Sequence, residues 1–132
     1  MSNLQDPTAA PSRLCTFDFP QSLSQHLVWS GLYGSAPALA IAEAAAHNPG
    51  LSVVVVRDTQ SLLKLQEALR FYADPSLKIL TFPDWEILPY DWFAPHEDII
   101  SERLETLYTL GSATSALLLV AVPTLLHRLA PR

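Results

Sequence analysis

The sequence predicts an α/β domain, a parallel sheet with flanking helices. The chain has 132 residues, of which 49 % are hydrophobic and 16 % charged, so it can bury one core. Two apolar runs, at 51–57 and 116–122, lack polar alternation, which is typical of strands buried on both faces of a parallel sheet. Segments with helical periodicity separate the apolar runs, as expected where crossover helices join parallel strands.

The sequence as a whole predicts a flexible leader over residues 1–22 and one α/β subdomain over 23–132. A short buried strand is predicted at 27–29, and a turn with two glycines follows it. An alanine-rich helix is then expected from 36 to about 47. Proline is tolerated in its first turn, and an Asn-Pro-Gly sequence ends it.

The middle of the chain predicts a strand, a helix and another strand. The β-branched run at 51–57 is the first strand, and Asp58 or Thr59 then caps the helix. The next strand is expected at 77–81. Four apolar side chains fall on one face of the intervening helix: Leu62, Leu65, Leu69 and Tyr72.

The last third predicts a helix from an N-cap at Asp98 to Leu110, with Gly111 just beyond it. The buried strand at 116–122 follows, and Pro123 opens a final helix. The expected inner positions of the 98–110 helix are Ile100, Leu104, Leu107 and Tyr108. The expected outer positions are Glu102, Arg103 and Glu105.

The charge and the single cysteine exclude several classes of protein. The formal net charge is −5 with only eight lysines and arginines, whereas a domain that binds nucleic acid through its phosphates is usually basic. Cys15 cannot form an intrachain disulfide, which suits a reducing compartment. The N-terminus lacks the pattern of a signal peptide, and no apolar run reaches the ~20 residues of a membrane helix. We expect a soluble, cytoplasmic chain with no membrane partner, and no tight DNA binding by this segment.

The turn after residue 30 lies where a phosphate-binding loop belongs. Written against G-x-x-x-x-G-K-[ST], Gly31 matches, Ala36 replaces the second glycine, Pro37 replaces the lysine and Ala38 replaces the hydroxyl residue. Neither replacement can bind phosphate or magnesium, so no active nucleotide site is expected. The segment is either a degenerate P-loop or an ordinary turn. Its diagnostic positions are Gly31, Gly34, Ser35, Ala36, Pro37 and Ala38.

The most distinctive stretch, residues 82–110, concentrates aromatic and acidic side chains. It holds two of the three tryptophans and seven of the thirteen acidic residues, with three prolines spaced six apart. The carboxylates lack the convergent pattern of a metal site, and no catalytic constellation is evident. The aromatic residues are interpreted as core packing or, if exposed, as a protein-docking patch. We expect Trp85 and Tyr90 to be largely buried, and Asp91 and Asp98 to make turn or cap hydrogen bonds.

This stretch closely resembles the N-terminal module of bacterial transcription-repair coupling factors (the Mfd family). The resemblance spans about residues 25–130. It is carried by FPDWE at 82–86, LPYD at 88–91, PH at 95–96, DIIS at 98–101, RL at 103–104 and VAVPTL at 120–125. The family motif, also weighed as a docking surface, includes Trp85, Tyr90, Asp91, Trp92, Asp98 and Arg103.

The resemblance implies a P-loop-NTPase-like fold, similar to domain 1a of the repair protein UvrB, with a degenerate Walker A motif. It implies no catalytic, cofactor or metal residue in this fragment. It also implies a full-length ATP-dependent DNA translocase, using ATP and Mg²⁺, whose partners are UvrA, RNA polymerase and DNA. Two alternatives stay open: a stand-alone protein-interaction domain, and an active nucleotide-binding phosphoryl-transfer domain.

Overall fold

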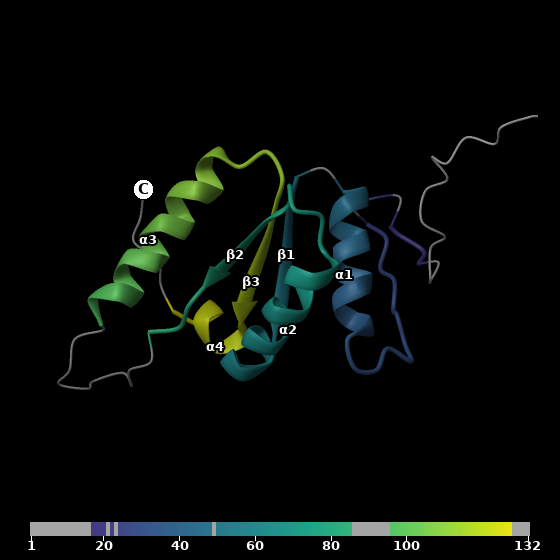
Figure 1. The fold of residues 1–132 in the computed structure, drawn as a ribbon, viewed down its shortest axis with the longest axis horizontal. Helices are drawn as coiled ribbons and strands as arrows, with labels where there is room; N and C mark the ends of the chain where they lie inside the picture. The colour runs from purple at the N-terminus through teal and green to yellow at the C-terminus, as the bar shows by residue number, and fades with distance from the viewer. Residues whose placement is uncertain (1–16, 21, 23, 49, 86–95, 128–132) are drawn as a thin grey trace, which may run out of the picture.

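The α/β fold class is confirmed by the computed structural model, which describes residues 17–20, 22, 24–48, 50–85 and 96–127. Three parallel strands alternate with helices along the chain (Figure 1). The elements in order are α1 (Ala36–His47), β1 (Leu51–Val56), α2 (Thr59–Tyr72), β2 (Lys78–Phe82), α3 (Glu97–Ser112), β3 (Ala116–Ala121) and α4 (Val122–Leu125).

The sheet has the strand order β1-β3-β2, and both pairs of strands are parallel. Burial on both faces is confirmed for β3, which lies between the other two strands and is almost wholly buried. The same prediction is wrong for β1, where exposed and half-buried positions alternate. Among the described strands β1 pairs only with β3, so it forms one edge of the sheet. An apolar run alone does not reveal that edge position.

The core lies between the sheet and the pair of helices α1 and α2 (Figure 1). Leu69 of α2 and Leu117 and Leu119 of β3 are its largest fully buried side chains. The predicted apolar face of α2 is confirmed, because Leu62 and Leu69 are buried and Leu65 and Tyr72 pack against the same cluster. Small alanine side chains on α1 let this helix approach α2 closely. The buried alanines are Ala38, Ala40, Ala42 and Ala45.

The predicted strand at 27–29 is wrong. These residues form no strand, and Val28 is 91 % exposed. Trp29 instead contacts Phe17 and Phe19 at ring-centroid distances of 5.7 and 6.1 Å. Its Nε1 donates to the backbone oxygen of Asp18 at 3.1 Å. Contacts with residues earlier in the chain, which a local pattern does not include, therefore hold this segment.

The carboxylate of Asp58 caps the start of α2, as the sequence predicted. Its Oδ1 accepts a hydrogen bond from the Ser61 backbone N–H at 2.7 Å, and its Oδ2 accepts one from Arg57 Nε at 2.8 Å. The backbone hydrogen bond from Ser61, followed by the contact with Arg57, lowers the pKa of Asp58 from 3.8 to about 2. The charged carboxylate satisfies an N–H that the first helical turn leaves unpaired.

Replacing Asp58 with alanine is expected to lower the urea midpoint of unfolding at neutral pH, because the cap is lost. A lowered pKa in the folded state means that the stabilisation is complete above 3.8 and is lost as the pH falls toward 2. The difference between wild type and Asp58→Ala should therefore shrink across that interval. Asp58→Ser keeps a cap oxygen without this titration and is the control. A difference that stays constant through the interval would contradict the assignment.

Helix α3 is present as predicted, but its buried face is not the predicted one. Arg103 and Thr106 are buried, whereas Leu104, Leu107 and Tyr108 are exposed. The prediction placed the apolar residues of α3 against the sheet. That placement is expected only where the surface facing the helix is itself apolar. Here polar groups at the end of β2 offer partners: the Thr106 hydroxyl donates to the backbone oxygen of Thr81 at 2.8 Å.

The ends of α3 also differ from the prediction. The helix begins after His96 rather than Asp98, because Nδ1 of His96 lies 3.4 Å from the Asp98 backbone nitrogen and accepts from it. Asp98 is exposed, and its Oδ2 lies 3.1 Å from the same Nδ1. The two can form an ion pair only when Nδ1 carries a proton, and Nδ1 then no longer accepts from the Asp98 N–H. Gly111 lies inside the last turn, which ends at Ser112. Nearer the C-terminus, α4 has Pro123 in its first turn, as predicted, and spans Val122–Leu125.

Candidate functional site

The turn before α1 keeps only part of the geometry of a phosphate-binding loop. Gly31 and Gly34 have positive φ values of 75° and 61°, a region that glycine adopts without steric cost. The turn leads directly into α1, as a P-loop leads into its helix. The strand that should precede it is missing from the described part of the chain, as noted for residues 27–29.

The N–H groups at the start of α1 are already engaged. Ala36 donates to Tyr33 O at 3.1 Å, and Ala38 and Leu39 both donate to Ser35 O at 3.0 and 3.2 Å. Pro37 has no N–H to offer. A phosphate site at a helix N-terminus needs such donors to point at the ligand. From residue 36 to 39, none is free to do so.

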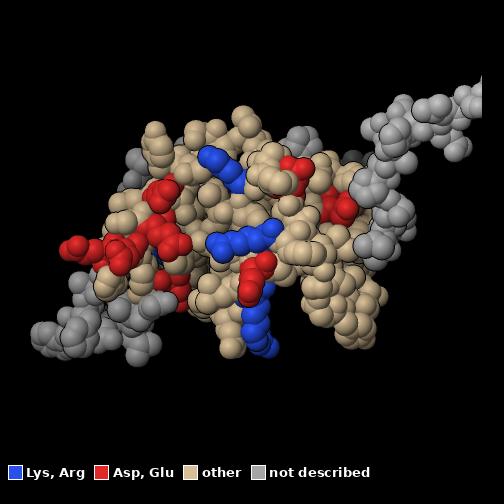
Figure 2. All heavy atoms as spheres, in the orientation of Figure 1, with Lys and Arg blue, Asp and Glu red and all other residues tan. Residues whose placement is uncertain are grey.

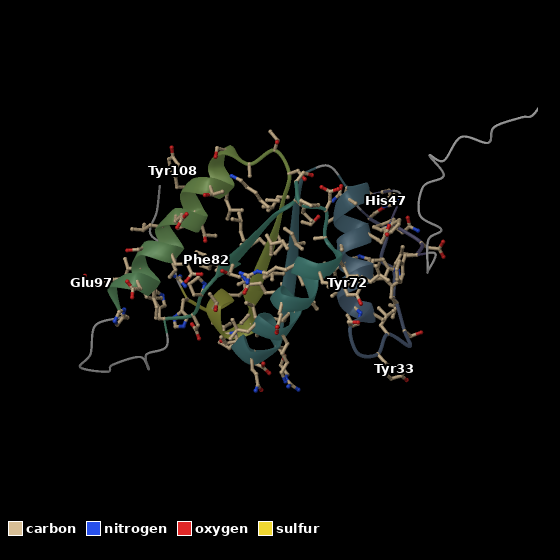
Figure 3. All side chains as sticks on the ribbon, viewed as in Figure 1. Tyr33, His47, Tyr72, Phe82, Glu97 and Tyr108 are labelled. Carbon is tan, nitrogen blue, oxygen red and sulfur yellow. The ribbon has the colours of Figure 1, made fainter. Side chains whose placement is uncertain are left out.

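The side chains of the turn are also committed or apolar. Ser35 Oγ lies 2.9 Å from the hydroxyl of Tyr72, which ties the start of α1 to the end of α2. Figure 3 labels Tyr72 at the end of α2, beside α1. Ala38, at the magnesium-ligand position of the motif, is buried in the core. This arrangement suits packing of α1 on α2 better than phosphate binding.

A second cluster, which we call the Arg103 clamp, joins α3 to the end of β2. It consists of Arg103, Phe82, Pro83, Asp84 and Trp85. The guanidinium carbon lies 4.0 Å from the Phe82 ring centroid and 4.2 Å from that of Trp85. Arg103 Nη1 donates to the backbone oxygen of Pro83 at 2.5 Å. Stacking on aromatic faces suits the planar guanidinium, so this position calls for arginine rather than lysine.

Burial and a nearby carboxylate act on Arg103 in opposite directions. Burial lowers the pKa of Arg103, and the negative charge of Asp84 opposes that shift. Asp84 in turn accepts from the Trp85 backbone N–H at 2.9 Å and lies 3.2 Å from His127 Nε2. The Arg103 Nη2 atom is buried and has no hydrogen-bond partner in the part of the chain that the structure describes. The clamp therefore fixes α3 to the sheet with charge, stacking and hydrogen bonds together.

A cavity of about 400 Å³ lies beside the clamp, at the carboxyl ends of β2 and β3. Ligands of parallel α/β sheets commonly bind at this edge. The lining mixes charges of both signs with apolar groups, including Arg70 of α2 and Glu102 of α3. Thr124 of α4 also lines it, and its buried Oγ1 has no hydrogen-bond partner among the described residues. The lining includes no residue of the glycine turn, so the two features that the sequence singled out do not form one site.

The residues of the predicted family motif differ in how far the structure buries them. Trp85 is mostly but not fully buried, in keeping with the prediction, Arg103 is buried, and Asp98 is exposed. Tyr90, Asp91 and Trp92 lie outside the described residues, so their predicted burial and turn bonds stay predictions. The sequence did not predict that Asp84 would interact with Arg103 and His127, or that Thr124 would line the cavity. Asp84 and Thr124 lie within the motif segments at 82–86 and 120–125, which was the available signal.

The surface charge fits the low basic content of the sequence. Figure 2 shows acidic side chains gathered over α3 and a few basic ones near the centre of the same face. Helix α3 alone carries Glu97, Asp98, Glu102 and Glu105. Among the described residues, no helix is long and apolar enough to cross a membrane, and no three His, Cys, Asp or Glu side chains gather as metal ligands would.

Comparison with known proteins gives a consistent set of relatives, although no family model matches the chain. A transcription-repair-coupling factor of Haemophilus influenzae is 40 % identical over 114 residues, which are 86 % of this chain and 10 % of that protein. The Escherichia coli factor is 36 % identical over 115 residues, 87 % of this chain and 10 % of its own length. A Rickettsia typhi factor is 33 % identical over 81 residues, 61 % of this chain and 7 % of that protein.

The chain thus spans about a tenth of the length of the curated relatives it matches. This family is the one that the motif at 82–104 and the segment at 120–125 resemble. The chain belongs to the transcription-repair-coupling factor family and corresponds to an N-terminal fragment of its members.

Proposed function

We propose that this chain is a non-catalytic, UvrB-like N-terminal module of a transcription-repair-coupling factor. The observation that carries the proposal is the start of α1. Pro37 and Ala38 occupy the positions where a working Walker A loop has lysine and a hydroxyl residue, and the N–H groups of Ala36 and Ala38 donate to carbonyl oxygens of the turn. Such a turn can position α1 but lacks the groups that hold a triphosphate and its magnesium.

In the whole protein, the module would serve as a scaffold and as part of an autoinhibitory, partner-masking unit. The complete factor would couple repair to stalled RNA polymerase in the cytoplasm. Its motor, elsewhere in the chain, would use ATP and Mg²⁺ to move along DNA and would recruit UvrA. This fragment would contact other domains of the same chain. Its acidic surface supports a role without tight DNA binding of its own.

The proposal predicts that the 132-residue chain does not bind ATP. Calorimetric titration with ATP and Mg²⁺ should show no saturable heat up to millimolar nucleotide, because the turn offers neither lysine nor free N–H donors at residues 36–39. The full-length factor, titrated in parallel, is the positive control. Micromolar affinity of the fragment for ATP would instead favour the active phosphoryl-transfer domain.

A stand-alone protein-interaction domain is the second candidate, and the exposed apolar side chains of α3 favour it. Two observations separate the candidates. A reading frame that ends at Arg132 would favour the stand-alone domain, and one about ten times longer would favour the module. Capture of UvrA by residues 1–132 alone would show that the fragment has its own partner surface, whereas the module is expected not to capture it.

A further inference from the structure

The register of the parallel strands divides the sheet into two chemically similar faces. Leu117 and Leu119 of β3 point into the core with α1 and α2, together with Val54 and Val56 of β1. Their neighbours along each strand point to the other face, because side chains alternate. On that face the pairs, in parallel register, are Leu51 with Ala116, Val53 with Leu118, and Val55 with Val120.

This second face is open over β1. Leu51, Val53 and Val55 are 48 %, 52 % and 50 % exposed, although all three are large aliphatic side chains. Helix α3 contacts β2, and α4 contacts β3. Helix α2 contacts β1 and packs against α1, and both of these helices lie on the core face. In Figure 1, α3 lies beside β2, at the side of the sheet away from α1. The described helices therefore leave one side of β1 without a covering layer.

The flank of α3 extends this apolar surface. Glu102 accepts a hydrogen bond from the Thr81 hydroxyl at 2.8 Å, which places that side of α3 toward the core face, because Thr81 pairs with Leu119. Leu104 and Leu107 lie on the opposite flank of the helix from Glu102. They are 61 % and 41 % exposed. The two leucines and the outer side chains of β1 thus border the same open side.

We propose that this open face, formed by Leu51, Val53, Val55, Leu104 and Leu107, is the docking surface for an amphipathic helix from a part of the same polypeptide beyond residue 132. Parallel sheets are covered by helices on both faces because their strands carry apolar side chains on both sides. The face carries no charged side chain among these five, so an apolar helix stripe complements it and a nucleic acid does not. This docking proposal rests on the proposed function in one respect only. It requires that the 132 residues are part of a polypeptide about ten times longer, as the relatives are.

A second copy of the chain is the weaker occupant. The net charge of −5 opposes association of two identical surfaces. A helix in the same polypeptide, by contrast, reaches the face at a high effective concentration set by the connecting segment. Self-association is therefore an outcome that the experiment below must detect.

Thiol labelling of the full-length factor tests the proposal. In a Cys15→Ser background with any other reactive cysteines replaced, Val53→Cys reports on the open face and Lys64→Cys, on the exposed side of α2, is the matched control. The maleimide reaction of Val53→Cys should be about tenfold slower or more in the native full-length protein than in the 132-residue chain, because only rare opening exposes a covered thiol. Lys64→Cys should react at similar rates in both.

The same measurement keeps the proposal falsifiable if the short chain folds poorly. In the full-length protein alone, the native rate is compared with the rate in urea, and Val53→Cys should be protected where Lys64→Cys is not. Equal native rates for the two thiols would overturn the proposal. Protection that disappears on dilution would assign the face to a second copy and overturn it as well. Neither result depends on ATP or UvrA, so the proposed function is tested separately.

Discussion

Replacing Arg103 with alanine is expected to lower the free energy of unfolding by about 2–4 kcal/mol. Arg103 is 3 % exposed, and its guanidinium contacts the rings of Phe82 and Trp85. Truncation would remove both ring contacts and the hydrogen bond to Pro83 O, and would leave a cavity between α3 and the sheet. Urea denaturation followed by tryptophan fluorescence measures the change, with far-UV circular dichroism as the second probe.

Two further variants separate the clamp from a general effect of removing charge from α3. Arg103→Lys keeps the charge but cannot stack in the same planar manner, so it should recover only part of the lost stability. Glu105→Ala, at an exposed position of the same helix, should change the unfolding free energy by less than about 0.5 kcal/mol. If Arg103→Ala unfolds at the same urea concentration as wild type, the clamp does not hold α3.

Replacing Leu69 with alanine is expected to cost about 3–5 kcal/mol, the range for deleting a buried leucine where the surroundings relax only partly. Leu69 is fully buried and belongs to the cluster that includes Leu117 and Leu119. Its loss would open a cavity between α2 and the central strand. Thermal and urea unfolding should both show the decrease.

Leu63 is the matched control, since it has the same chemistry on the same helix and is 57 % exposed. Leu63→Ala should cost less than about 1 kcal/mol, because little apolar area returns to water. Similar losses for the two variants would mean that the core is not where the structure places it.

Local signals were sufficient for most of the helices and strands. The Asn-Pro-Gly sequence ends α1, and Asp58 begins α2, because each acts on backbone groups within one helical turn. The run at 51–56 forms a strand because it is rich in β-branched side chains, and the run at 116–121 is recognisable as a buried strand by its short, continuous apolar pattern. The loss of motif residues at Pro37 and Ala38 is likewise a property of the sequence alone.

The candidate site was predictable only in part. Arg103 and Trp85 were singled out through the motif at 82–104, but their contact across the end of β2 was not, because the two residues belong to different elements. Arg103 was placed on the outer side of its helix, since a charged residue is usually exposed. Its burial depends on two rings and a backbone carbonyl that only the folded chain brings to it.

The sequence by itself determined the α/β class, the positions of α1, α2 and the three strands, and the departure of the glycine turn from a working P-loop. Only the tertiary structure decided that β3 is central and β1 an edge strand, that residues 27–29 stay outside the sheet, and that α3 buries Arg103 and Thr106 while Leu104 and Leu107 remain exposed. Caps and periodicity act over a few residues, whereas strand order and the buried face of a helix depend on partners distant in the chain.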